Sequence, residues 1–240
     1  MTPIFFVTGT DTGVGKTAVT CALVRTLIQS GCRARAVKPI ESGCAMDAAG
    51  ELQPADALAH RRAAGLEHLP LERFIRYRLA EPLAPAVAAE RAGVTIELEA
   101  CLELVQAAAA ETDVLLVEGA GGLLVPLAGT AGTGYQTVAD FIARLGCPTL
   151  VVARARLGTL NHVLLTWNEL HRRGLPCVGV ILNDTDAEAG PEREDNARVL
   201  RAFGVPVLAE LPYGMTHLEP YQLEPYLSDA RRYLTGNPPP

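Results

Sequence analysis

The fold is decided by one stretch of this 240-residue sequence, GTDTGVGKT at residues 9–17. An apolar run at 4–7 precedes the stretch, and an Ala/Val/Leu-rich run at 18–28 follows it. We therefore expect a strand, a glycine-containing loop and a helix, which is the order typical of a triphosphate-binding loop. The usual pattern has a glycine where Thr10 stands, and here Gly9 lies one residue earlier. A glycine turn before an ordinary helix is the simpler alternative.

Loop amides and a helix N-terminus favour anions, so this loop is predicted to hold the phosphates of a nucleotide. Lys16 would neutralise phosphate charge, and the Thr17 hydroxyl would ligate magnesium. The residues expected to contact the nucleotide here are Thr10, Asp11, Thr12, Gly13, Val14, Gly15, Lys16 and Thr17.

Composition narrows the class of protein. The chain is 49% hydrophobic and 20% charged, with a net charge of −6 and no block of Lys or Arg, which argues against nucleic acid as a partner. The apolar runs are too short to span a bilayer, so no membrane partner is expected. The six cysteines and five histidines lack the spacing of a metal site. The first residues enter a strand without a basic leader segment, so we expect a cytoplasmic protein.

Short apolar runs alternate with helical stretches along the chain. Continuous apolar runs are typical of buried parallel strands, and the βαβα order predicts one doubly wound, mostly parallel α/β sheet with helices on both faces. The expected strands are 4–7, 34–38, 114–118, 149–153, 177–182 and 207–211, and the expected helices are 16–29, 54–64, 96–110, 138–145, 161–173 and 193–203. We expect one domain over 1–235, a disordered tail at 236–240, and an edge strand at 73–79.

Polar residues follow the expected strands at the sheet edge where ligands gather in such folds. Lys38 ends the second strand and would add a second cation beside the phosphate loop, although a lone lysine there is usually a surface residue. Glu118 ends a buried strand, where a carboxylate would help to hold magnesium. Asp56 lies in the first turn of a helix, where it is either a third metal ligand beside Thr17 and Glu118 or a helix-dipole partner.

Three further segments admit both a binding role and a local structural role. The glycines at 119–122, including Gly119 and Gly121, would let the backbone approach a ligand or would make a tight turn. The segment 157–162 opens a helix whose free amides would bind a carboxylate, unless Thr159 merely caps it. Asn183 would read a purine edge or form a turn.

Taken together, these motifs resemble those of the dethiobiotin synthetases, which are ATP-dependent enzymes of biotin synthesis with a P-loop NTPase fold. The matching strings are VTGTDTGVGKT (7–17), KPIESG (38–43), the segment around Asp56, EPLAP (81–85), VEGAGGLLVPL (117–127), LGTLNH (157–162) and ND (183–184). They cover roughly 3–212 in the family's order, and the family's own glycine offset accounts for Gly9.

The resemblance implies a homodimeric, magnesium-dependent ligase that converts 7,8-diaminopelargonic acid, CO2 and ATP into dethiobiotin, ADP and phosphate. One amine captures CO2 as a carbamate, the carbamate attacks the γ-phosphorus, and the second amine closes the ureido ring. The resemblance assigns catalysis to Lys16 and Lys38, with Thr12 and Ser42 on the substrate. It places the substrate carboxylate at Gly158, Thr159, Leu160 and Asn161 of the partner subunit, and adenine at Asn183 and Pro212.

The sequence departs from the family pattern around Arg156, where a lysine is common, and after Asn183. Two rival families share the phosphate loop. ParA/MinD-like switch ATPases carry an additional lysine early in the loop, and residues 10–14 contain none. Amide-forming relatives of the cobyrinate diamide type carry a glutaminase domain, for which this chain has no room.

Overall fold

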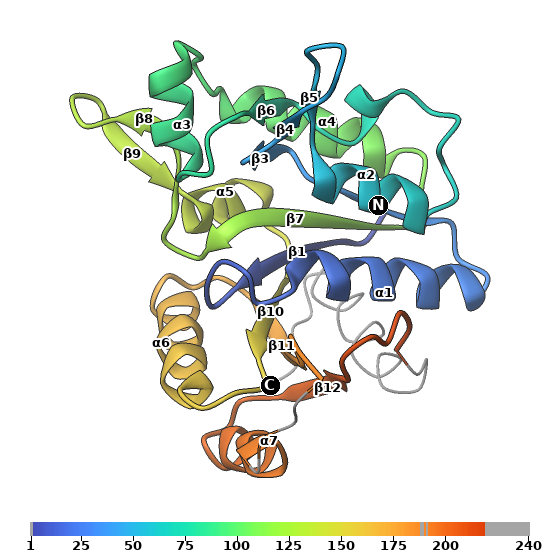
Figure 1. Ribbon diagram of the computed structural model, residues 1–240. Coiled ribbons are helices and arrows are strands. Elements are labelled where there is room, and N and C mark those ends of the chain that lie inside the picture. The colour runs from blue at the N-terminus through green and yellow to red at the C-terminus, as the bar shows by residue number, and fades with distance from the viewer. Residues whose placement is uncertain (1, 188–189, 191, 219–240) are drawn as a thin grey trace.

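The computed structural model (Figure 1) describes residues 2–187, 190 and 192–218. Its centre is a six-stranded sheet whose neighbouring strands all run parallel. The order across the sheet is β12 (Val207–Leu211), β11 (Cys177–Asn183), β10 (Thr149–Arg154), β1 (Ile4–Gly9), β7 (Val114–Gly122) and β2 (Ala34–Val37). All six strands expected from the apolar runs are therefore confirmed, because residues buried on both faces read as continuous apolar segments.

Helices cover both faces, as the doubly wound prediction required. Along β1, Phe5 and Val7 pack against α1 (Lys16–Gln29), whereas Phe6 packs in the opposite core. Successive side chains of a strand point to opposite faces, so one apolar strand supports both layers. Figure 1 shows α1 running alongside β1. The opposite core receives side chains from α4 (Leu98–Ala109), α5 (Val138–Leu145), α6 (Thr159–Arg172) and α7 (Glu192–Ala202).

The remaining elements lie outside the main sheet. Helices α2 (Ala55–Ala63) and α3 (Pro85–Ala92) have a short 3-10 helix at Leu71–Arg73 between them in the chain, and the other strands form small two-stranded sheets. These sheets pair β3 (Ile40–Ser42) with β6 (Tyr77–Leu79), β4 (Ala45–Met46) with β5 (Leu52–Gln53), and β8 (Pro126–Thr130) with β9 (Gly134–Thr137).

The edge strand expected at 73–79 is wrong in extent. Only Tyr77–Leu79 is a strand, and it pairs with β3 outside the main sheet. The reason is tertiary burial: Phe74 and Ile75 bury their side chains against Ala57 of α2, which bends the chain before a longer strand can form.

The domain end expected at 235 and the disordered tail expected at 236–240 lie outside the described residues. Within the described part of the chain, no helix combines the length and the apolar character needed to cross a membrane. The phosphate loop follows β1, which lies between β10 and β7 near the middle of the sheet. The carboxyl ends of these strands bring the candidate site together.

Candidate active site

The loop after β1 has the backbone of an anion cradle. Gly13 and Gly15 have φ values of 72° and 88°, the left-handed region that favours glycine, and Gly15 directly precedes α1. A Cβ on Gly15 would lie 2.0 Å from Nδ2 of Asn183, so no larger residue fits without rearrangement. The strand, loop and helix predicted from 9–17 are all present.

Lys16 begins α1 and folds back over this loop. Its side chain is buried, and Nζ donates a hydrogen bond to the Asp11 carbonyl at 3.1 Å. Burial, reinforced by the nearby charge of Lys38, lowers the pKa of Lys16 to about 8. An anionic phosphate beside Nζ would favour the charged form and oppose this shift.

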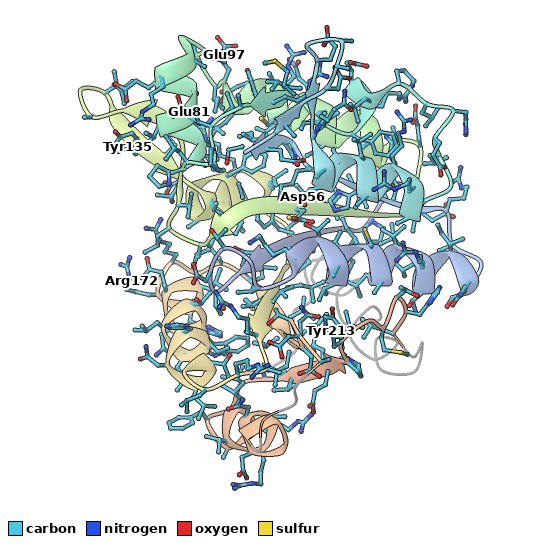
Figure 2. All side chains as sticks on the ribbon, in the orientation of Figure 1. Asp56, Glu81, Glu97, Tyr135, Arg172 and Tyr213 are labelled. Carbon is cyan, nitrogen blue, oxygen red and sulfur yellow. The ribbon has the colours of Figure 1, made fainter. Side chains whose placement is uncertain are left out.

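Three oxygen-bearing side chains converge at the start of α1. The Thr17 hydroxyl lies 2.7 Å from Asp56 Oδ1 and 3.0 Å from Glu118 Oε1. Figure 2 labels Asp56 in the middle of the molecule, at the level of β7 and α1. Among residues 2–187, 190 and 192–218, no cluster of three His, Cys, Asp or Glu side chains is arranged to hold a metal by itself. Two carboxylates, one hydroxyl and phosphate oxygens are nevertheless the hard donor set that Mg²⁺ takes in nucleotide sites, so these residues fit the ion.

Lys38 bridges the two carboxylates of this cluster. Its Nζ lies 2.7 Å from Asp56 Oδ2 and 2.6 Å from Glu118 Oε1, and only 4% of its side chain is exposed. Burial disfavours the charged form, but the carboxylates of Glu118 and Asp56 outweigh it and raise the pKa of Lys38. Burial likewise opposes ionisation of Glu118, and the charges and hydrogen bonds of Lys38 and His60 nevertheless hold its pKa below the ordinary range. The cluster therefore places a buried, charged Lys38 against an ionised Glu118, with Asp56 as the second partner of the ammonium.

Two buried side chains support the cluster from outside. Glu41 accepts hydrogen bonds from the amides of Asp56 and Ala57 at 3.0 and 3.1 Å, which caps the first turn of α2 and fixes the backbone of Asp56. The Asp56 carboxylate itself points to Thr17 and Lys38, so the alternative of a helix-dipole partner does not describe its contacts. His60, one turn later on α2, lies 2.8 Å from Glu118 Oε2.

A cavity of about 640 Å³ opens between the phosphate loop and the chain segments at 82–85 and 120–125. Ten of the predicted site residues line it: Thr12, Gly13, Gly15, Lys16, Thr17, Lys38, Ser42, Asp56, Glu118 and Gly121. The cavity thus collects residues to which the resemblance assigns catalytic, phosphate-binding and metal-binding roles. Its volume is large enough for a small substrate beside the phosphates.

A second cavity, of about 390 Å³, lies on the other side of the loop, between it and the start of α6. Its lining includes Thr10, Asp11, Val14, Thr159 and Arg154. The Thr159 hydroxyl is buried and has no hydrogen-bond partner among the described residues. Of the neighbouring predicted residues, Gly158 is the N-cap of α6, and Leu160 and Asn161 follow in its first turn. These four residues therefore stand apart from the larger cavity of the same chain.

The remaining predicted residues lie near the loop but outside both cavities. Asn183, at the end of β11, is buried and donates from Nδ2 to the Val14 carbonyl at 3.0 Å. Pro212 directly follows β12, the neighbour of β11 in the sheet. Gly119 packs under the ring of Phe6, since a Cβ there would lie 2.8 Å from the ring. A packing role therefore explains this glycine without a ligand.

Sequence reasoning assigned no role to three residues that the structure brings to the site. Glu41 lies within the quoted string 38–43, and His60 lies four residues after Asp56, the spacing that places two side chains on one face of a helix. That spacing was the available signal for His60. Arg154 ends β10 and contacts the Asp11 carboxylate at 3.3 Å and the Thr12 carbonyl at 3.2 Å. Only the order of strands in the sheet brings Arg154 to the loop.

Comparison with known proteins gives a consistent result. A family model described as an AAA domain matches residues 4–220. A relative from Anaeromyxobacter dehalogenans (strain 2CP-C), named ATP-dependent dethiobiotin synthetase BioD, is 47% identical over 227 residues, which cover 95% of this chain and 92% of the relative. A protein of Salmonella typhi named ATP-dependent dethiobiotin synthetase BioD 1 is 36% identical, over 89% of this chain and 90% of its own length.

Solved structures show a more distant likeness. A ParA family ATPase from Chlorobium tepidum matches with a TM-score of 0.51 at 16% identity, over 98% of this chain and 91% of its own. The septum site-determining protein MinD from Pyrococcus horikoshii also gives 0.51, at 20% identity, over 97% and 89%. At such identities the likeness concerns the fold alone, and it confirms the predicted parallel P-loop architecture. With the motifs, the site and relatives at 36–47% identity in agreement, the chain belongs to the ATP-dependent dethiobiotin synthetase family.

Proposed function

We propose that this chain is an ATP-dependent ligase that forms dethiobiotin from 7,8-diaminopelargonic acid and CO2, releasing ADP and phosphate. The observation that carries the proposal is the cavity of about 640 Å³, which joins a phosphate loop, two lysines and three acids in one space. Membership of the dethiobiotin synthetase family supports the substrate assignment. ATP is accordingly the co-substrate.

The residues of the cavity suit each step of this reaction. One amine of the substrate adds to CO2 and gives a carbamate, which is already anionic and needs no protein base to attack the γ-phosphorus. Its oxygen forms a bond to phosphorus while ADP leaves, and the second amine then attacks the carbamoyl carbon and expels phosphate. Lys16 and Lys38 stabilise the negative charge on the carbamate and the transferring phosphoryl group. Thr12 and Ser42, which line the same space, bind the substrate or its carbamate.

We also propose that Thr17, Asp56 and Glu118 hold a magnesium ion with the nucleotide. Oxygens of Asp56 and Glu118 lie 2.7 and 3.0 Å from the Thr17 hydroxyl, and such oxygens are the ligands that this ion prefers. When bound, Mg²⁺ neutralises charge on the β- and γ-phosphates. The backbones of the loop residues Thr10 to Lys16 and of Gly121 would approach the phosphates, while Gly119 of the same strand packs against Phe6.

Adenine recognition is assigned to Asn183 and Pro212, which end adjacent strands next to the loop. The substrate carboxylate is assigned to Gly158, Thr159, Leu160 and Asn161 of a partner subunit. The buried, unpartnered Thr159 hydroxyl among the described residues supports a polar ligand at this turn. The exposure of Leu165 on α6, at 63%, supports an isologous homodimer through this helix.

A cytoplasmic location completes the proposal. All six cysteines are free, and disulfides are rare in reducing compartments. Fractionation of cells that produce the protein tests this point. A periplasmic location would contradict it.

The main rival is a ParA/MinD-like nucleotide switch. The support for this rival is the likeness in fold. The additional lysine that such switch ATPases carry early in the loop is missing here, because residues 10–14 contain no lysine. The acidic Asp11, paired with Arg154, lies in this part of the loop. The rival is therefore less well supported than the synthetase.

Phosphate release from Mg·ATP and bicarbonate, measured with and without 7,8-diaminopelargonic acid, tests the proposal directly. Phosphate and dethiobiotin should appear one for one and only with the diamine, with product identified by mass spectrometry. Lys16→Ala is the inactive control. Hydrolysis that ignores the diamine and rises with DNA or lipid would instead identify a switch ATPase.

A further inference from the structure

His60 occupies a place that apolar packing alone does not explain. Its side chain is fully buried, and Nε2 lies 2.8 Å from Glu118 Oε2. An ionised carboxylate only accepts hydrogen bonds, so the imidazole donates in this pair. Its Nδ1 is buried and has no hydrogen-bond partner among the described residues. A buried polar nitrogen without a partner costs free energy, so the contact with Glu118 is the favourable feature of a histidine here.

The two oxygens of Glu118 face different partners as a result. Oε2 faces His60, whereas Oε1 accepts from Lys38 Nζ at 2.6 Å and lies 3.0 Å from the Thr17 hydroxyl. The last torsion of a glutamate is broad, so a carboxylate held at one oxygen alone keeps freedom to rotate. A donor on Oε2 restricts that rotation and keeps Oε1 directed at Thr17.

Helix α2 couples this contact to the second acid. Asp56 and His60 are four residues apart and lie on one face of the helix, whose first turn is held by Glu41. The same rigid element therefore supplies one carboxylate directly and positions the other through an imidazole.

We propose that His60 is a positioning residue that holds Glu118 with Oε1 toward Thr17 and thereby raises the affinity of the protein–nucleotide complex for its divalent cation. The proposal rests on the metal site of the proposed function. Hydrogen bonds that orient metal-binding carboxylates and imidazoles typically change metal affinity about 10–100-fold when removed. His60 touches neither substrate nor phosphate in this scheme, so its role is indirect.

Binding of Mn²⁺ to the protein–ADP complex, followed by the EPR signal of the free ion, tests the role without turnover. His60→Leu removes the donor at similar volume and is expected to weaken Mn²⁺ binding about 10–100-fold, while ADP affinity in EDTA stays within about twofold. His60→Gln offers an amide donor of similar reach and should recover most of the affinity. His60→Asn is too short to reach Glu118 and should behave like His60→Leu.

Val105→Ala, a cavity-forming change in α4, is the control for a general loss of stability. It should leave Mn²⁺ affinity at the wild-type value although it lowers the unfolding temperature. In turnover, His60→Leu should raise the apparent KM for Mg²⁺ and leave kcat at saturating Mg²⁺ within about twofold.

Equal Mn²⁺ affinity of wild type and a folded His60→Leu protein would overturn the proposal. If His60→Leu does not fold, the comparison of His60→Gln with His60→Asn decides, and equal affinities would overturn it in the same way. A wild-type protein that binds ADP but no Mn²⁺ would overturn the metal site of the proposed function itself. The two failures are therefore distinguishable.

Discussion

Two charged clusters in this molecule have ion pairs of nearly the same length in different surroundings. In the site, Lys38 lies 2.6 Å from Glu118 and 2.7 Å from Asp56. On α6, Glu169 lies 2.7 Å from Arg172 and 2.6 Å from Arg173. Figure 2 places Asp56 in the middle of the molecule and Arg172 at its left-hand side, on α6. The Lys38 side chain is 4% exposed and the Arg172 side chain 68%.

The difference shows that contact distance alone does not determine what an ion pair does. Hydrogen bonds from Arg172 and Arg173 lower the pKa of Glu169 to about 2, but water solvates each group as soon as its partner moves away. In the site, the side chains of Lys38 and Glu118 are 4% and 0% exposed, so water replaces Lys38 beside Glu118 less readily than it replaces Arg172 beside Glu169. Removing one member there leaves a buried charge without compensation. Variants at four positions test this contrast, in order of decreasing expected effect.

Lys38→Met should have the largest effect. It leaves Glu118 and Asp56 without the cation that bridges them, which should destabilise the fold by about 3–5 kcal/mol. Loss of charge stabilisation at the reacting phosphoryl group should lower kcat by about 10²–10³-fold. Urea unfolding and steady-state kinetics measure the two effects. An unfolding free energy equal to that of wild type would contradict the prediction, because it would show that the Lys38 cluster behaves like a solvent-exposed ion pair.

Glu118→Gln should have a smaller effect on stability, because Lys38 keeps Asp56 as its partner and the amide retains the shape of the side chain. We expect a loss of about 1–3 kcal/mol in unfolding free energy from imperfect hydrogen bonding. Mn²⁺ binding to the ADP complex should weaken more than in His60→Leu, because a direct ligand changes. The reverse order of affinities would contradict the assignment of Glu118 as a ligand.

Arg154→Ala probes an intermediate environment, because its side chain is 45% exposed. Its contacts with Asp11 and the Thr12 carbonyl fasten the outer side of the phosphate loop. Exposed ion pairs contribute about 0–1 kcal/mol, so KM for ATP should rise about two- to fivefold with kcat little changed. Wild-type KM should also increase with ionic strength, and the variant should lose part of this salt dependence.

Glu169→Gln should have the smallest effect. Arg172 is largely exposed to water and Arg173 keeps its contact with Asp140, so the unfolding midpoint and the rate of dethiobiotin formation should match wild type within error. A marked loss of stability would show that the cluster on α6 is less solvated than its exposure indicates.

Sedimentation of the same variant reports whether α6 carries the proposed dimer contact, since a change in mass would involve this helix in association.

Much of the fold was predictable because its signals are local. Six continuous apolar runs became the six strands of the sheet, and the run after the phosphate loop became α1 with the expected bounds. The failure at 73–79 has a physical cause. The alternation of apolar and basic residues predicted a strand over the whole segment. Burial of Phe74 and Ile75 against Ala57, however, depends on a helix elsewhere in the chain, which no local pattern encodes.

The sequence by itself determined the phosphate loop as a glycine-containing turn between a strand and a helix, because residues 9–17 and their neighbours carry these signals locally; the contacts of Arg154 and Asn183 with the loop come from the folded sheet. It also determined that Lys38, Asp56 and Glu118 would stand at element ends with suitable chemistry. Tertiary structure alone decided their contacts: Thr17 and Asp56 are 39 residues apart, and Thr17 and Glu118 are 101. Such contacts exist only because β7 lies beside β1 and α2 packs over the sheet. The arrangement of these strands and of α2 follows from burial of the whole core, to which distant parts of the chain contribute together. The roles of His60 and Glu41 depend on that arrangement, so the sequence did not reveal them.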